Sequence, residues 1–301
     1  MAVSDTSDKK QNAWRDVYYT SHDGLRLYAR DYGSRLSDAV PVLCLPGLTR
    51  NCRDFHQLAV ALSTHPGNPR RVVCVDYRGR GRSQYDRDWK NYSPEIELRD
   101  VLDVLVVCGL QDVAVIGTSR GGILAMIMAA VRPGQMAGVI LNDVGPEIAA
   151  KGLARIKSYV GKMPPVRDWR DAADLTKSLN EHQFPNRDDD TWMRFARQTF
   201  VEKDGKPVPD YDPLLSKHLD RVDLSRPIAT LWPQFEALRH IPTMVIRGEN
   251  SDLLEPQSVD AMRERHPGLH VVEAAESGHA PFLEEPPTLK HINTFLARLD
   301  P

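Results

Sequence analysis

The chain alternates between short apolar runs and longer segments in which apolar residues recur at helical spacing. The short runs are typical of strands buried on both faces of a parallel sheet, and they occupy residues 40–45, 71–76, 112–116, 139–141, 243–246 and 270–272. The helical patterns lie between and after them, at residues 55–62, 98–105, 123–131 and 289–299. Strand and helix repeated in this way predict an α/β fold with a mostly parallel, doubly wound sheet.

A different pattern comes before the first of these runs. Two β-prone segments, residues 17–20 and 25–29, flank the pair Asp23 and Gly24. An Asp-Gly pair between such segments is a strong signal for a β-hairpin. We therefore expect an N-terminal antiparallel hairpin at one edge of the sheet.

One long segment interrupts the alternation. Residues 146–235 contain several helical stretches with many large aromatic side chains and no convincing strand. A segment of this length is too long for a loop. It predicts a helical cap, or lid, inserted into an α/β core made of residues 13–145 and 236–301. The polar residues 1–12 are expected to form a flexible tail.

Composition narrows the possible partners and the compartment. The formal net charge is −2, with both signs spread along the chain, which predicts neither a nucleic-acid partner nor an anionic membrane surface. No apolar stretch approaches the roughly 18 residues of a membrane span, and the N-terminus lacks the apolar region of a signal peptide. The four cysteines show no metal-ligand or redox spacing, so we expect buried free thiols, a cytoplasmic location, and no metal or other cofactor. Whether the chain is a monomer or a homodimer stays open.

The motif with the clearest chemistry is Gly-Thr-Ser-Arg-Gly at residues 117–121. It directly follows the predicted strand at 113–116 and opens the apolar helix of residues 122–131. This strand–turn–helix setting is that of a nucleophile elbow. The sequence thus predicts Ser119 as a catalytic nucleophile.

A serine hydroxyl needs a base, and the base needs an acidic partner. His279 follows the last predicted strand, at the edge of the sheet where open α/β sheets bind ligands, and is the candidate base. Asp143 and Asp252 each follow a predicted strand, and spacing alone does not choose between them. We favour Asp252 as the acid and expect Asp143 to brace the turn into the inserted segment.

An oxyanion hole is expected beside the serine. Its donors are the backbone N–H of Arg120 and that of Leu48, in the loop after the strand at 40–45, where Gly47 lets the chain turn. Each such donor contributes about 3 kcal/mol to transition-state stabilisation. The side chains of Arg50 and Arg120 either attract a carboxylate on the substrate or point to solvent, and the sequence leaves both alternatives open.

The run Asp-Tyr-Arg-Gly-Arg-Gly-Arg-Ser at residues 76–83 is rich in glycine and arginine. It lacks the Gly-Lys-Ser/Thr ending of a phosphate loop, and a single basic run in a slightly acidic chain is weak evidence for RNA binding. We interpret it as a structural loop that follows a strand.

Taken together, these segments resemble the α/β-hydrolase superfamily, in the order in which that family carries them and over nearly the whole chain. The segments concerned are residues 45–47, 76–83, 117–122, 248–252 and 278–285. The resemblance implies an acid after the strand at 243–246, which supports Asp252, and a cap after the strand at 139–141. A serine at position 119 is unlike epoxide hydrolases and haloalkane dehalogenases, which use aspartate. Pro46 replaces the histidine that most members have before Gly47, but the backbone donor does not depend on that side chain.

Three functions are compatible with these residues. The leading hypothesis is a carboxylesterase or lactonase, a serine hydrolase that cleaves an ester or lactone of a small to medium hydrophobic substrate through an acyl-enzyme. The second is a C–C bond hydrolase of the meta-cleavage-product type, although Arg120 and Ala280 depart from the residues usual there. The third is a hydrolase-fold ligand receptor with little turnover.

Overall fold

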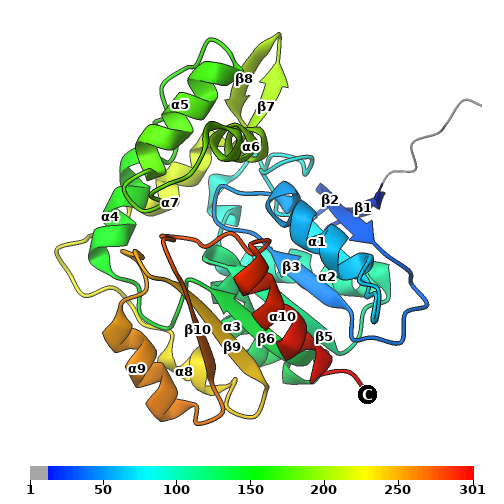
Figure 1. Cartoon of the computed structure of the whole chain (residues 1–301). Helices are drawn as coiled ribbons and strands as arrows, with labels where there is room; N and C mark the ends of the chain where they lie inside the picture. The colour runs from blue at the N-terminus through cyan, green and yellow to red at the C-terminus, as the bar shows by residue number, and fades with distance from the viewer. Residues whose placement is uncertain (1–12) are drawn as a thin grey trace, which may run out of the picture.

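A computed structural model describes residues 13–301, and an eight-stranded sheet with the order β1-β2-β4-β3-β5-β6-β9-β10 forms its centre (Figure 1). The strands are β1 (Trp14–Thr20), β2 (Arg26–Tyr32), β3 (Val42–Leu45), β4 (Val72–Asp76), β5 (Val113–Thr118), β6 (Met136–Asn142), β9 (Thr243–Gly248) and β10 (His270–Ala274). β1 and β2 form the expected antiparallel hairpin, β2 is also antiparallel to β4, and the remaining neighbours are parallel. The predicted strands are confirmed. The predicted tail, residues 1–12, lies outside the described residues.

Helices cover both faces of the sheet, as the alternation predicts. Side chains of α1 and α10 pack on one face, and those of α2, α3, α8 and α9 pack on the other. The helices of this layer structure are α1 (His56–Ser63), α2 (Pro94–Cys108), α3 (Arg120–Val131), α8 (Trp232–Glu236), α9 (Pro256–Arg265) and α10 (Pro286–Ala297). Short 3₁₀ turns are η1 (Cys52–Phe55), η2 (Trp89–Asn91), η3 (Pro133–Gln135) and η4 (Pro213–Leu215).

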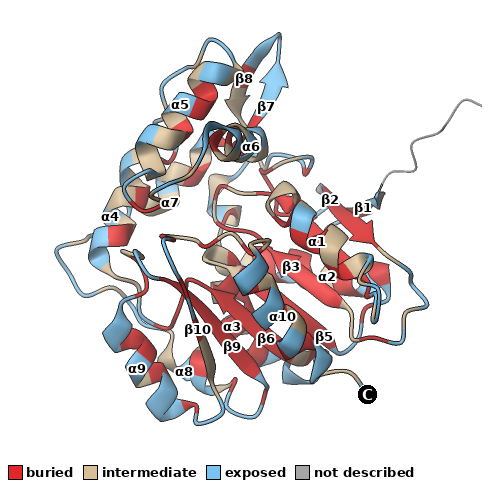
Figure 2. Ribbon diagram, in the orientation of Figure 1, coloured by how far each residue is buried: buried red, intermediate tan, exposed pale blue. Residues whose placement is uncertain are grey.

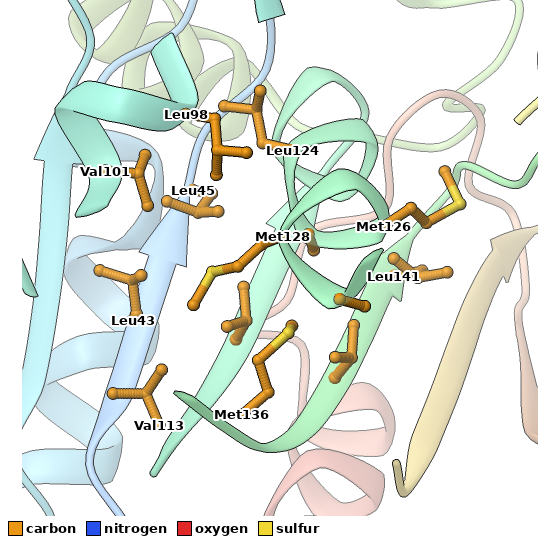
Figure 3. Close-up of a cluster of buried hydrophobic side chains, with 14 of the residues drawn as sticks. Leu43, Leu45, Leu98, Val101, Val113, Leu124, Met126, Met128, Met136 and Leu141 are labelled. Carbon is orange, nitrogen blue, oxygen red and sulfur yellow. The ribbon is translucent and has the colours of Figure 1, made fainter. Parts of the chain in front are cut away.

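The central strands are buried along their whole length, because both of their faces meet helices (Figure 2). Figure 3 shows one face, where Leu43 and Leu45 of β3 lie near Leu98 of α2 and near Leu124 and Met128 of α3. All four cysteines are free and buried, which confirms the expectation for the thiols. Among the described residues, no helix combines the length and the apolar character that crossing a membrane requires.

The segment between β6 and β9 holds the predicted helices together with a small sheet (Figure 1). Its elements are α4 (Ala150–Tyr159), α5 (Trp169–Asn180), α6 (Asp189–Thr199), β7 (Phe200–Lys203), β8 (Lys206–Pro209) and α7 (Ser216–Asp220). The expectation that residues 146–235 contain no strand is wrong, since β7 and β8 form an antiparallel pair. Both strands are short, β7 is mostly exposed, and β8 contains two prolines, so they lack the apolar signal of a core strand. We call residues 146–235 the inserted segment.

Helix α3 packs unusually close to the sheet at the turn that carries Ser119. A Cβ atom added to Gly121 would lie 2.0 Å from the Leu45 carbonyl oxygen, and one added to Gly117 would lie 2.5 Å from the Gly121 carbonyl oxygen. Both contacts are with backbone, which cannot rotate away. The two glycines of the motif are therefore required by the approach of the helix to β3 and β5.

We predict that Gly121→Ala lowers the free energy of unfolding by about 3 kcal/mol, because the added methyl group forces α3 away from β3. Urea denaturation of purified protein measures this difference. Gly134→Ala is the matched control: no atom lies within 4 Å of its added Cβ, so the change should stay within about 0.5 kcal/mol. Equal stability of the two variants would contradict the close packing described above.

Candidate active site

Ser119 lies at the point where β5 ends and α3 begins. Its backbone has φ 52° and ψ −111°, a conformation that is strained for a residue with a side chain. The Ser119 N–H donates to the Asn142 carbonyl, at 3.0 Å, while the Ser119 carbonyl accepts from the N–H groups of Gly122 and Ile123. These three bonds hold the strained turn and present the hydroxyl at the carboxyl end of the strand.

His279 follows β10 and reaches back to the serine. Its Nε2 atom lies 2.9 Å from Ser119 Oγ, and its Nδ1 atom lies 2.8 Å from Asp143 Oδ2. With an ionised Asp143, the ring carries its proton on Nδ1 and donates it to the carboxylate, which leaves Nε2 to accept from the serine hydroxyl. The structure brings the two residues predicted as nucleophile and base into hydrogen-bond contact.

The acid beside His279 is Asp143, and the choice of Asp252 is corrected. Asp143 directly follows β6, has no exposed surface, and accepts three hydrogen bonds. Besides His279, its donors are the N–H of Gly248, at 2.8 Å, and the hydroxyl of Ser251, at 2.6 Å. A carboxylate that is fully buried and bonded by three donors is well placed to orient an imidazole.

Asp252 instead pairs with a helix of the inserted segment. Both of its carboxylate oxygens accept from the Arg155 guanidinium of α4, at 2.7 and 2.8 Å. Burial acts to raise the pKa of the Asp252 carboxyl, but the hydrogen bonds and the charge of Arg155 outweigh it, so its pKa is lowered. Within residues 13–301 no hydrogen bond joins Asp252 to His279. Its contacts tie α4 to the loop after β9.

The two expected oxyanion donors lie on either side of the serine. Arg120 is the first residue of α3, where backbone N–H groups have no partner within the helix. Leu48 belongs to the loop after β3, and a Cβ added to the neighbouring Gly47 would lie 3.9 Å from Ser119 Cβ. Across residues 13–301, neither the Leu48 nor the Arg120 N–H donates a hydrogen bond to the protein. Both donors remain available to an oxygen atom bound at Ser119.

The two arginine side chains suggested for a substrate carboxylate are already paired. Arg50 binds Asp54 through Nε and Nη2, both at 2.7 Å, and also donates to the hydroxyl of Thr199. Arg120 donates to Glu97 at 2.7 Å. Each guanidinium group has a carboxylate partner inside the protein, so neither is free for a substrate carboxylate and neither simply points to solvent.

A cavity of about 140 Å³ opens above Ser119 and His279. Its apolar lining comes mainly from α4, α5, α6 and the loop after β10, through Ile156, Val160, Met163, Leu175, Leu179, Phe195, Phe282 and Leu283. Phe195 and Phe282 meet edge to face, with ring centroids 5.5 Å apart. The inserted segment thus supplies much of the wall opposite the serine.

A cluster of side chains that could bind a metal ion lies outside this cavity. Within the described part of the chain, the one cluster of such groups is His22, Asp23 and Asp100. Both aspartates are bound by the guanidinium of Arg78, at 2.6 to 3.1 Å. Their carboxylates already have a cationic partner.

Two residues that bind the predicted site residues were not predicted from the sequence. Ser251 lies in the loop that was expected to supply the acid, and it supplies a hydroxyl donor to Asp143 instead. Glu97 accepts a hydrogen bond from the side chain of Arg120. The sequence did contain a signal for its burial, because Glu97 shares one helix face with the apolar Val101 and Val104. An acidic residue on an apolar helix face indicates a buried ion pair.

Comparison with known proteins identifies the family of this chain. The model of the alpha/beta hydrolase family matches residues 42–289. The chain belongs to this family. The crystal structure of an alpha/beta hydrolase from Novosphingobium aromaticivorans DSM 12444 is similar, with a TM-score of 0.87 and 39% identity, over 95% of this chain and 99% of that one. The resemblance stated from the sequence motifs, and the fold it implies, are confirmed.

Two named relatives are hydrolases of esters or oligomers. The 3-hydroxybutyrate-oligomer hydrolase of Cupriavidus necator is 29% identical over 268 residues, which is 87% of this chain and 89% of the relative. The sn-1-specific diacylglycerol lipase ABHD11 of Mus musculus is 25% identical over 260 residues, or 85% and 80% of the two chains. This chain is thus a member of a hydrolase family with esterase-like and lipase-like relatives.

We predict that Asp143→Asn lowers kcat about a thousandfold or more, because the neutral amide can turn its NH2 group toward Nδ1, which favours the wrong tautomer, and no longer stabilises the imidazolium by charge. Asp252→Asn should leave kcat within about threefold, since Asp252 touches neither His279 nor the cavity. Steady-state hydrolysis of a p-nitrophenyl ester by both variants provides the comparison.

Thermal denaturation serves as the control for folding. Asp252→Asn should lower the melting temperature, because Arg155 loses its partner. A larger fall in kcat for Asp252→Asn than for Asp143→Asn would show that His279 depends on Asp252 after all.

Proposed function

We propose that this protein is a serine hydrolase that cleaves a carboxylic ester with a short, uncharged acyl group through an acyl-enzyme. The observation that carries the proposal is the chain of hydrogen bonds from Ser119 through His279 to Asp143 at the floor of a cavity with both apolar and polar lining. The 3-hydroxybutyrate-oligomer hydrolase and the diacylglycerol lipase among its relatives support an ester bond as the target.

The reaction proceeds in two halves. Ser119 Oγ attacks the ester carbonyl while His279 Nε2 takes the hydroxyl proton, and Asp143 stabilises the imidazolium that forms. His279 then protonates the departing alcohol, which leaves an acyl group on Ser119. In the second half His279 activates a water molecule, which releases the acid and restores the serine.

The negative oxygen of each tetrahedral intermediate would bind between the N–H groups of Leu48 and Arg120. Each donor stabilises the transition state by about 3 kcal/mol. Arg120 also begins helix α3, whose N-terminus carries partial positive charge and favours an anion. One of the two oxyanion donors and the strained serine therefore come from one turn of the chain, and the other donor comes from the loop after β3.

The cavity favours a short and uncharged acyl group. An apolar cavity of about 150 Å³ binds a molecule of the size of benzene, and the space above Ser119 is about 140 Å³. Arg50 is neutralised by Asp54, and the half-buried Glu284 adds a further acidic group to the lining. Burial raises the pKa of Glu284. A carboxylate on the acyl group would meet this acid without a free cation to balance it.

The inserted segment fits the role of a cap. Its helices line the cavity, and its Gln183 contacts the backbone N–H of His279 at 3.4 Å. A cover of this kind excludes water from the acyl-enzyme and sets the size of the substrate. We include residues 146–235 in the proposal as the element that selects the substrate.

We predict that the wild-type protein hydrolyses p-nitrophenyl butyrate with a kcat/KM at least about tenfold above that for p-nitrophenyl laurate, because the cavity holds only a short chain. A lactone and a vinylogous diketone of the ring-fission type complete the substrate panel. Turnover of the diketone in preference to every ester would replace the proposal with C–C bond hydrolysis.

Ser119→Ala should lower kcat for p-nitrophenyl butyrate by at least about ten-thousandfold, since no other group replaces the nucleophile. The exposed Ser178 of α5 offers a matched control, and Ser178→Ala should behave as wild type. Labelling of the wild type by a fluorophosphonate without multiple turnover of any substrate would support a receptor instead of an enzyme.

A further inference from the structure

A buried carboxylate lies behind the serine turn and contacts neither Ser119 nor His279. Glu97, in the first turn of α2, has no exposed surface and lies between two arginine side chains. Glu97 Oε1 lies 2.7 Å from Arg80 Nη1, and Glu97 Oε2 lies 2.7 Å from Arg120 Nε. Arg80 is also fully buried, and Arg120 is partly buried.

One of these arginines is an oxyanion-hole residue itself. Arg120 follows Ser119, and besides Glu97 its guanidinium donates to the carbonyl of Tyr92 at 3.1 Å. The Ser119 carbonyl, in the same peptide unit as the Arg120 N–H, accepts from Gly122 and Ile123. The side chain and the peptide of Arg120 are thus both held, and the N–H points away from the helix.

The other arginine, Arg80, binds the loop that carries Leu48. Arg80 Nε donates to the carbonyl of Leu48 at 2.7 Å. The preceding peptide is also bound, because the Gly47 carbonyl accepts from the N–H of Arg50 at 3.1 Å. Both peptide units that flank the Leu48 Cα atom are therefore fixed, and one of them carries the Leu48 N–H.

Charge explains why this arrangement is rigid. Burial acts to raise the pKa of the Glu97 carboxyl, but the nearby charges of Arg120 and Arg80 outweigh it and lower its pKa. Glu97 is therefore ionised, and a buried carboxylate keeps its cationic partners close. Two guanidinium groups and one carboxylate leave one net positive charge behind the place where the oxyanion forms.

We propose that Glu97 is a positioning residue that holds the two halves of the oxyanion hole at a fixed separation, through Arg80 to Leu48 and through Arg120 to its own N–H. This inference rests on the proposed function, because it assigns Leu48 and Arg120 to transition-state binding. It also gives the glycine- and arginine-rich run at residues 76–83 a role in the site.

Glu97→Gln keeps the shape of the side chain and removes its charge. We expect kcat for p-nitrophenyl butyrate to fall about 10- to 100-fold, with KM within about threefold, because preorganised donors act mainly on the transition state. Butyl trifluoromethyl ketone forms a tetrahedral adduct with serine, so its inhibition constant should rise by the same factor as kcat/KM falls. The midpoint of the pH profile should stay in place, since Glu97 does not contact His279.

Asp31→Asn is the matched control for loss of a buried carboxylate. Asp31 of β2 has a fully buried side chain and binds Arg71 at 2.9 and 3.1 Å, outside the cavity. This variant should lower the melting temperature yet leave kcat and ketone affinity within about twofold of wild type. If Glu97→Gln does not fold, Arg120→Met breaks one link of the same network and should show a smaller loss with the same signature.

The outcomes separate this inference from the proposed function. A folded Glu97→Gln or Arg120→Met protein with wild-type kcat and ketone affinity overturns the inference, and so does a loss of kcat without loss of ketone affinity. A wild type that turns over no ester overturns the proposed function instead. In that case the rate at which a fluorophosphonate labels Ser119 still tests Glu97, and an unchanged rate in Glu97→Gln overturns the inference.

Discussion

The close approach of α3 to β3 and β5 is the constraint on which the rest of the site depends. The helix comes so near to the sheet that Gly117 and Gly121 have no room for a side chain. This approach forces Ser119 into a strained turn at the carboxyl end of β5 and leaves the first N–H groups of the helix open. It also brings the loop after β3 beside the serine. Nucleophile and both proposed oxyanion donors therefore follow from one packing contact.

Around this turn, acidic and basic side chains pair with each other rather than with a ligand. Arg50 binds Asp54, Arg120 binds Glu97, and Arg155 binds Asp252. Each pair connects segments that are distant along the chain or adds rigidity to a loop at the cavity. The arginines thus bind carboxylates of the protein, and none of these three guanidinium groups is left without an acidic partner.

Much of the fold could be predicted because burial on two faces leaves a continuous apolar run in the sequence, as in β3 and β4. The hairpin β7–β8 left no such signal, since both strands are short, β7 is mostly exposed and β8 contains two prolines. Ser119 and His279 could be found because a nucleophile elbow and a histidine after the last strand depend on local spacing. Glu97 went unnoticed because its partners, Arg80 and Arg120, lie in other segments of the chain.

The sequence by itself determined the order of strands and helices, the serine turn and the histidine, because each depends on residues that are neighbours along the chain. Which aspartate lies against His279 was decided only by the tertiary structure. Asp143 and Asp252 both follow strands at the same edge of the sheet, and spacing treats them alike. Their surroundings differ: Gly248 and Ser251 hold Asp143 against His279, whereas Arg155 of the inserted segment takes both oxygens of Asp252. Contacts between segments far apart in sequence therefore determine which aspartate binds His279. Such contacts also determine the shape of the cavity above Ser119.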